Sequence, residues 1–259
     1  MSEKIKIAIL GASGRMGQIL SHQFAADSRF EVVARIDSRS IDDNMQPAII
    51  PSLADAPQFD VLVDFSAPAA TTAALEHMRT RHSAWIVATT GIAGDVRSQI
   101  QDLSKQSPIF IASNTSLGVA LMQRLCKQVT EALLDWDTEI VEVHHRNKVD
   151  APSGTALSLA KAIADVQETA GNRPQIVTDR ASRREPRPEH EIGVSSVRGG
   201  TVAGEHTITW YGPHEQLQIR HVAENREIFA NGTRRIASWI ASKPAGLYEM
   251  QDMLNDILK

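Results

Sequence analysis

The chain has 259 residues, of which 42% are hydrophobic and 22% charged, so it is long enough to bury a substantial core in one or two domains. Its formal net charge of −4 argues against a nucleic-acid-binding protein, which needs a concentrated basic face, and no apolar run suits a signal peptide or a membrane span. The single cysteine, Cys126, cannot form an internal disulfide, which fits a reducing cytoplasm, so we expect a cytoplasmic protein. Cys126 lies in a helical pattern, and we expect it to be a structural thiol.

Buried strands alternate with helices in the first half of the chain. Short apolar runs predict strands at residues 5–10, 32–36, 61–65, 85–88 and 109–112. Helical patterns follow the first strand and recur near 69–82 and 94–106. This alternation is typical of a parallel sheet with helices on both faces. We therefore predict an α/β fold whose first domain, a Rossmann-type parallel sheet, spans 1–115 and is completed by about 226–259.

A glycine-rich turn joins the first predicted strand to the first helix. Gly11 permits a tight turn, Gly14 lets backbone N–H groups approach a pyrophosphate, and Gly17 allows close packing of the helix on the sheet. The start of the helix adds a partial positive charge that faces the phosphates. Asp37 ends the second strand, where its carboxylate can accept hydrogen bonds from an adenosine ribose. These features in this order predict a dinucleotide site rather than a plain strand–turn–helix unit.

The residues after Asp37 bear on the choice between NADH and NADPH. An acidic side chain alone repels a 2′-phosphate and favours NADH, whereas Arg39 and the hydroxyls of Ser38 and Ser40 can compensate for that charge. The alternative is that Arg39 lies in a solvated loop. We predict that the protein uses both cofactors.

Small and hydroxyl-bearing residues follow the later strands of this sheet. Because ligands bind outside the carboxyl ends of parallel strands, such residues are candidates to approach a nicotinamide, although they would also suit ordinary turns. The candidates are Phe65, Ser66, Ala88, Thr89, Thr90, Gly91, Ser113, Asn114, Thr115 and Ser116.

The second half groups its strands together, which indicates a smaller α+β domain with an open mixed sheet over residues 116–225. Helices are predicted at 117–134 and 154–168, strands at 138–143, 176–178, 192–197, 206–211 and 217–223, and a further helix at 229–240. An arginine-rich loop at 180–187 is expected to be solvated and mobile. Helices on one side of the sheet leave its other face for another subunit to cover, so we predict a homo-oligomer, most simply a tetramer.

Proton donors are concentrated in the motif EVHHRNKVDAPSGT, residues 142–155. His144 and His145 end a predicted strand and point to opposite sides, so one can face a substrate while the other serves a different purpose. Lys148 follows across a turn. A purely structural histidine pair and a surface lysine are the alternatives, and a metal site is disfavoured because the motif lacks a nearby cysteine and the His-x-x-x-His spacing. Spacing alone leaves the catalytic and the structural interpretations open.

The end of the same motif predicts a site for a carboxylate. Ser153 is a candidate N-cap after Pro152, and Gly154 and Thr155 then offer backbone N–H groups and a hydroxyl at the start of a helix. The apolar residues that follow have helical spacing and are expected to anchor this helix to its domain.

Several motifs resemble those of the 4-hydroxy-tetrahydrodipicolinate reductase (dihydrodipicolinate reductase) family. They are GASGRMG, VDFS, SNTSLGV, EVHHRNKVDAPSGTAL, VRGGTVAGEH, FANG and KPAGLYEM, in the family's order over nearly the whole chain. The resemblance implies an NAD(P)H-dependent oxidoreductase of the diaminopimelate route to lysine. Its substrate would be the cyclic dicarboxylate 4-hydroxy-tetrahydrodipicolinate and its product tetrahydrodipicolinate. No metal, nucleic acid or membrane partner is expected.

The resemblance also implies roles for single residues. His144 matches the family's proton donor/acceptor and Lys148 a further proton donor, while His145, Gly154 and Thr155 match its substrate-binding residues. We add Ser153 to the substrate site, and Ser38 and Arg39 to the cofactor site. The remaining matches to cofactor contacts are Gly11, Ala12, Ser13, Gly14, Arg15, Met16, Asp37, Ala88, Thr89, Thr90, Ser113, Asn114, Thr115 and Ser116.

Two residues depart from the family pattern. Ser38 stands where many relatives have arginine, which leaves the preference for NADPH open, and Ala88 replaces a glycine. Two other functions are compatible with the fold: a related dehydrogenase for another amino-dicarboxylate, and a catalytically silent nucleotide sensor. The presence of both His144 and Lys148 disfavours the sensor.

Overall fold

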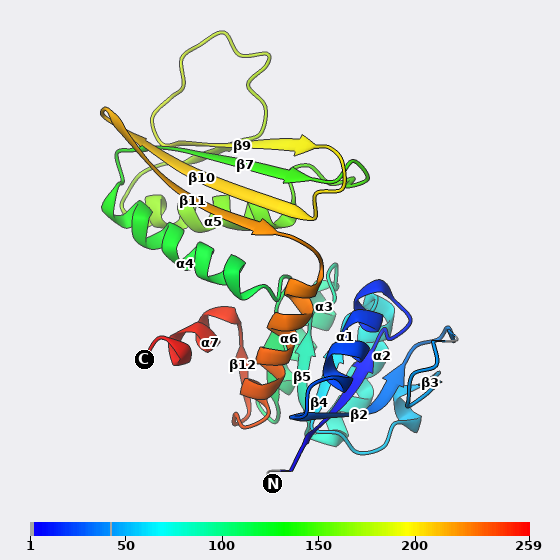
Figure 1. Cartoon of the computed structure of the whole chain (residues 1–259). Coiled ribbons are helices and arrows are strands. Elements are labelled where there is room, and N and C mark those ends of the chain that lie inside the picture. Colours follow the sequence, from blue (N-terminus) through cyan, green and yellow to red (C-terminus); the bar gives the residue numbers. More distant parts are fainter. Residues whose placement is uncertain (1–2, 42) are drawn as a thin grey trace. The chain divides into compact units, whose positions relative to one another are not determined.

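The computed structural model describes residues 3–41 and 43–259 and divides the chain into two compact units. The first unit combines the residues up to Ser116 with Glu227–Lys259, and the second is Leu117–Arg226 (Figure 1). In the part of the chain that is described, no helix is long and apolar enough to cross a membrane.

The first unit is a seven-stranded sheet in the order β12-β6-β5-β4-β1-β2-β3, and every neighbouring pair is parallel. Its strands are β1 (Ile5–Leu10), β2 (Phe30–Ile36), β3 (Ile49–Ile50), β4 (Val61–Asp64), β5 (Ala84–Val87), β6 (Pro108–Ile111) and β12 (Gly246–Tyr248). Its helices are α1 (Arg15–Ala25), α2 (Pro68–Arg81), α3 (Gly94–Leu103), α6 (Glu227–Ile240) and α7 (Met250–Ile257), with a short 3-10 helix at Leu53–Asp55.

Alternate side chains of the central strands bury both faces of this sheet. Leu62 and Trp85 pack with Leu75 of α2 and Ile100 of α3 in one apolar cluster. α1 contacts β1 and β2, α6 contacts β4, β5 and β6, and the two helices contact each other (Figure 1). The parallel sheet covered by helices was predicted, and the structure confirms it. The register aligns Leu10 with both Ile36 and Asp64, so the loops after β1, β2 and β4 leave the sheet at one edge.

Two strands of this sheet were not predicted. β3 has only two residues, too few for a periodic pattern to reveal. β12 follows α6 near the end of the chain, and pairs in parallel with β6 through Leu247 and Ile109. β12 has only three residues and begins with glycine, so its sequence alone does not predict a strand. It forms a strand because it pairs with the edge of the sheet.

The second unit is a five-stranded mixed sheet in the order β11-β10-β7-β9-β8. β7 and β8 run parallel to β9, whereas β10 is antiparallel to β7 and β11. The strands are β7 (Asp137–His144), β8 (Gln175–Val177), β9 (Glu191–Arg198), β10 (Gly204–Gly212) and β11 (Glu215–Ala223), and the helices are α4 (Leu117–Ala132) and α5 (Gly154–Thr169). This confirms the predicted open mixed sheet.

The two faces of this sheet differ in burial. Ile140, Ile208 and Leu159 of α5 share an apolar core with Cys126 of α4. Burial raises the pKa of the Cys126 thiol to about 12, as suits the predicted structural role. On the other face large apolar side chains remain exposed: Val141, Val197, Tyr211 and Val222.

The arginine-rich loop between β8 and β9 is not simply solvated, which corrects the prediction. Three of its arginines pair with carboxylates of β7 and β9, and one of these, Glu191, is buried. The pairs are Arg180–Glu139, Arg180–Glu191, Arg183–Glu191, Arg187–Glu139 and Arg187–Asp137. The spacing of arginines and prolines suggested a free loop because two of the partner carboxylates, Glu139 and Asp137, lie 41 to 50 residues away in the sequence.

Candidate active site

The glycine turn after β1 has the geometry that its sequence predicts. Gly11 has a φ of +85°, and a Cβ there would lie 2.4 Å from the carbonyl oxygen of Phe65. A Cβ at Gly17 would lie 2.1 Å from the carbonyl oxygen of Gly11, so only glycine lets α1 pack this closely against the turn. Gly14 is the N-cap of α1 and contributes no capping side chain. The turn and the helix start thus form a backbone cradle of the kind that binds a pyrophosphate.

The other predicted residues of this turn differ in exposure. Ala12 and Ser13 are buried, Met16 is half-buried and Arg15 is exposed. The hydroxyl of Ser13 is buried, and this side chain helps to lower the pKa of the Asp37 carboxyl.

Asp37, at the end of β2, closes this turn through its carboxylate. Its oxygens accept hydrogen bonds from the backbone N–H groups of Ser13 (3.1 Å) and Arg39 (3.0 Å). Burial alone would raise the pKa of Asp37, but these hydrogen bonds outweigh it and lower the pKa below its ordinary value. The carboxylate is therefore ionised. The Arg39 guanidinium lies 3.8 Å from it and is largely exposed.

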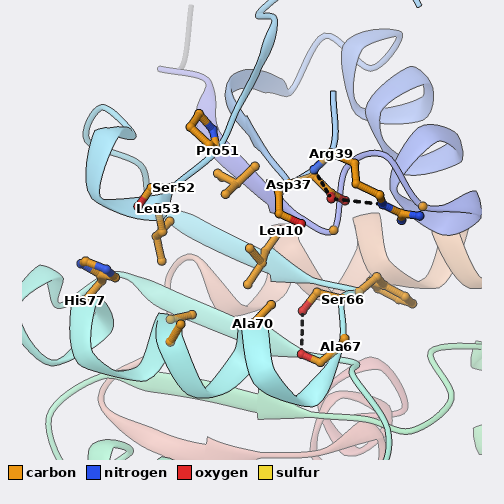
Figure 2. Close-up of a pocket in the computed structure, with 17 residues that line it drawn as sticks. Leu10, Asp37, Arg39, Pro51, Ser52, Leu53, Ser66, Ala67, Ala70 and His77 are labelled. Atoms are coloured by element: carbon orange, nitrogen blue, oxygen red, sulfur yellow. Dashed lines mark hydrogen bonds and ion pairs between the residues drawn. The ribbon is translucent and has the colours of Figure 1, made fainter. Parts of the chain in front are cut away.

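A cavity of about 540 Å³ opens beside this carboxylate, which is a size typical of small-molecule sites. Figure 2 shows it between Asp37 and Arg39 on one side and the helix α2, with Ala70 and His77, on the other. Five of the predicted cofactor residues line it, Gly11, Gly14, Asp37, Ser38 and Arg39, as do the strand-end candidates Phe65 and Ser66. The sequence analysis missed two other polar residues of the lining, Ser52 and His77, because neither lies at the end of a predicted strand.

A buried carboxylate connects the loops after β4 and β5. Asp64 accepts hydrogen bonds from the hydroxyls of Ser66 (2.5 Å), Thr71 (2.7 Å) and Thr89 (2.8 Å). Burial raises the pKa of Asp64, and these donors oppose the rise. The sequence analysis named Ser66 and Thr89 but missed Asp64, which fixes both loops at the ligand-binding edge of the sheet.

The predicted residues after β5 and β6 are placed differently from one another. Ala88 is buried, whereas Thr90 and Ser113 are exposed. Thr115 is buried and its hydroxyl donates to the carbonyl oxygen of Phe229 (2.8 Å), while Ser116 is buried and its N–H donates to the Asn114 side chain (2.9 Å). The Thr115 side chain is thus committed to α6, and a cofactor contact at this residue would have to come from its backbone.

In the second unit, the proton-donor motif is organised by Glu142 of β7. Its carboxylate is fully buried, and one oxygen, Oε2, lies 2.5 Å from Nδ1 of His144. Arg198 of β9 donates to both carboxylate oxygens at 2.6 and 2.9 Å, and the backbone N–H of Ser153 donates to Oε1 at 3.1 Å. Burial would raise the pKa of Glu142, but the hydrogen bonds, led by those from Arg198, lower it to about 2.

A second histidine, His206 of β10, completes this cluster. Its Nε2 lies 3.1 Å from the hydroxyl of Ser153, and its ring meets the ring of His144 edge-to-face with 5.3 Å between centroids. Burial, together with the nearby His144, lowers the pKa of His206 to about 4, so it is neutral near pH 7. The sequence analysis missed Glu142, Arg198 and His206 as parts of the site.

The helix start predicted to bind a carboxylate is capped as expected. Ser153 is the N-cap of α5, and its hydroxyl accepts a hydrogen bond from the N–H of Ala156 at 3.2 Å. Gly154, the first residue of the helix, is exposed, and Thr155 is half-buried. α5 is anchored by its buried apolar face, so its N-terminus is fixed next to the cluster.

His145 and Lys148 are partly exposed, whereas His144 is buried. That the two histidines point in opposite directions stays a prediction. The ammonium group of Lys148 pairs with both carboxylate oxygens of Asp150, at 2.8 and 2.9 Å. Arg198 also donates to the backbone carbonyl of Asp150 at 2.7 Å, so the loop is tied to the cluster around Glu142. Among the described residues, no group of three or more metal-ligating side chains could hold a metal ion.

Both units match models of known protein families. The model described as the N-terminus of dihydrodipicolinate reductase matches residues 5–115, and the one described as its C-terminus matches residues 118–254. The chain belongs to the dihydrodipicolinate reductase family. This reductase is 37% identical to the 4-hydroxy-tetrahydrodipicolinate reductase of Desulfovibrio desulfuricans, over 95% of this chain and 98% of that one. It is also 37% identical to the enzyme of the same name from Wolinella succinogenes, over 96% and 98% of the two chains.

Solved structures agree with this family in fold. A dipicolinate-bound dihydrodipicolinate reductase from Paenisporosarcina sp. superposes on the reductase with a TM-score of 0.79, at 23% identity over 95% of this chain and 98% of that one. An aspartate dehydrogenase from Thermotoga maritima reaches a TM-score of 0.52 at 12% identity, over 93% and 98% of the chains. The fold is thus shared with other dehydrogenases, and the family assignment depends on the sequence matches.

Proposed function

We propose that this oxidoreductase reduces 4-hydroxy-tetrahydrodipicolinate to tetrahydrodipicolinate with NADH or NADPH, in the diaminopimelate route to lysine. The observation that carries the proposal is the contact between His144 and the buried Glu142, next to the N-terminus of α5. It joins a proton donor to a site for an anionic substrate. The identities of 37% over nearly the full length of two named reductases support the same reaction.

The substrate carboxylates would bind at the start of α5 in the second unit. The backbone N–H groups of Gly154 and Thr155 lie in the first turn, where a helix favours an anion. The Ser153 hydroxyl already caps the helix and contacts His206, so Ser153 would hold the helix start in place rather than bind the substrate directly. His145 and Lys148 add donors at the rim, and a carboxylate that replaced Asp150 would recruit the ammonium group of Lys148.

His144 would deliver the proton that completes the reduction. Burial lowers the pKa of His144, and the contact with Glu142 opposes this by favouring the charged imidazolium. With Nδ1 bound to Glu142, Nε2 is the nitrogen left to donate to the substrate. Lys148 would stabilise negative charge as it develops on the substrate ring.

The cofactor would bind along the glycine turn and the cavity beside Asp37. The dinucleotide supplies the hydride when it is bound. The backbone of Gly11–Met16 would cradle the pyrophosphate, and the ionised Asp37 would accept hydrogen bonds from the adenosine ribose. Because Arg39 is exposed and stands 3.8 Å from that carboxylate, it can turn toward a 2′-phosphate, which supports use of both cofactors. Thr89 and Ser113, at the ends of β5 and β6, are candidates to contact the nicotinamide.

A homotetramer is the assembly that we infer for this protein. The open face of the second unit's sheet exposes Val141, Val197, Tyr211 and Val222, with exposed fractions of 40, 46, 46 and 48%. Apolar side chains on a flat sheet face favour coverage by the same face of another subunit. Light scattering that gives the mass of a monomer at micromolar concentration would contradict this assembly.

The activity can be tested with freshly generated substrate. The preceding synthase supplies 4-hydroxy-tetrahydrodipicolinate, and the oxidation of NADH or NADPH is followed in parallel assays. Turnover with both cofactors is expected. Turnover only with another amino-dicarboxylate, such as an aspartate- or homoserine-pathway compound, would instead identify a related dehydrogenase.

A further inference from the structure

Glu142 connects the two chemical parts of the substrate unit. Its Oε2 contacts Nδ1 of His144 at 2.5 Å, and its Oε1 accepts from the N–H of Ser153 at 3.1 Å. Arg198 reaches across from β9 and donates to both oxygens. One buried carboxylate is therefore in contact with the proton donor and with the N-cap of the anion-binding helix at the same time.

The charge on Glu142 decides which ring nitrogen of His144 carries a hydrogen. The Arg198 guanidinium, its bidentate partner, keeps the carboxylate ionised, and an ionised carboxylate can only accept hydrogen bonds. Nδ1 of His144 must then be the N–H that donates, so the neutral ring leaves Nε2 to exchange a proton. Nε2 lies beside Gly204 of β10, where an added Cβ would come within 3.0 Å of it.

We propose that Glu142, with Arg198 as its partner, is a positioning residue that fixes the tautomer and direction of His144 and ties this imidazole to the substrate-binding start of α5. The proposal rests on the proposed role of His144 as proton donor. In this proposal the reaction also depends on a carboxylate and a guanidinium that act through His144 rather than on the substrate itself.

The charged groups around His144 determine how its pKa depends on Glu142. Glu142 is the anion in direct contact, whereas Arg198 on β9 and Lys148 in the following loop both disfavour a second positive charge. His206 on β10 is neutral near pH 7 and meets the ring at its edge. Removal of the negative charge at 142 would therefore leave the imidazolium opposed by burial and by two cations.

The test is the variant Glu142→Gln, which keeps the size of the side chain and removes its charge. Loss of the charge lowers the pKa of His144. The fall in kcat that accompanies deprotonation of the imidazolium should therefore occur at lower pH. At neutral pH we expect kcat to fall about 100-fold, within the range that general acid catalysis contributes. The matched control is Glu139→Gln, because Glu139 lies on the same strand and also pairs with arginines, but in the cluster with Arg180 and Arg187. A folded Glu142→Gln protein with the kcat–pH profile of the control would overturn the proposal.

Nuclear magnetic resonance of the full-length wild-type protein tests the same inference without a variant. With ¹⁵N-labelled histidine, and with His144→Gln to assign the signal, neutral His144 should carry its hydrogen on Nδ1. A neutral ring with its hydrogen on Nε2 would exclude the proposed contact, even if Glu142→Gln did not fold. The two failures are distinguishable. Full turnover by His144→Gln would refute the proton-donor role, whereas the tautomer tests Glu142 alone.

Discussion

Gly17 offers a stringent test of how the dinucleotide cradle is built. A Cβ at this position would lie 2.1 Å from the carbonyl oxygen of Gly11 and 2.6 Å from Cα of Ala12, far inside the normal contact distance of about 3.5 Å. Both atoms belong to the backbone of the glycine turn, so the turn or the helix must move by about 1 Å to admit a methyl group. Overpacking of this kind costs about 1–3 kcal/mol. Alanine recovers about 1 kcal/mol through its helix propensity, which leaves a net loss of up to about 2 kcal/mol.

The matched control for Gly17→Ala is Gly94→Ala. Gly94 is the first residue of α3, and a Cβ there has no heavy atom within 4 Å in the described part of the protein. This control should leave the free energy of unfolding unchanged or raise it by up to about 1 kcal/mol. Urea denaturation measures the difference, and fluorescence titration with NADPH measures binding. Because the displaced turn would carry the pyrophosphate, we expect the Kd of Gly17→Ala to rise at least tenfold. Equal stability and equal Kd in the two variants would refute this account of the turn.

Further predictions concern the substrate unit and the choice of cofactor. His144→Gln and Lys148→Ala should each lower kcat by about 10²–10⁴-fold and leave the Kd for NADPH unchanged, since the cofactor residues lie in the other unit; unchanged turnover in both variants would remove the proposed mechanism. Thr155→Val should chiefly raise the apparent KM for the dicarboxylate, and a change confined to kcat in steady-state kinetics would count against the carboxylate site. The kcat of the wild type should fall as pH rises through the pKa of His144, which burial lowers, and a pH profile without this limb would contradict the proton-donor role. Arg39→Ala should raise the KM for NADPH more than the KM for NADH. Equal effects on the two KM values would indicate that Arg39 is only a solvated side chain.

Local patterns in the sequence were enough for the features that depend on neighbouring residues. The glycine spacing predicted the tight turn at Gly11 and the close packing at Gly17, and Ser153 was correctly identified as an N-cap. The alternating pattern before His144 predicted a strand, and side chains along β7 alternate between more and less buried. In each case the cause lies within a few residues of the effect.

Features that depend on distant partners were missed. Asp64 attracted no notice because an acidic residue that ends a strand is usually exposed, and its burial becomes intelligible only with Thr71 and Thr89 beside it. His206 lies 53 residues from the serine that it contacts, and Arg198 lies 56 residues from Glu142. Such pairs are determined by strand register, which spacing along the chain does not reveal.

The position of β12 has a consequence for how the protein is made. This strand completes the edge of the first unit's sheet beside β6, yet it is encoded after the whole of the second unit. During synthesis Leu117–Arg226 leaves the ribosome before Gly246–Tyr248 does, so the inserted unit can fold while its host still lacks α6 and its last strand. Removal of residues 227–259 would therefore damage the nucleotide-binding sheet, although most of its strands precede the second unit in the sequence.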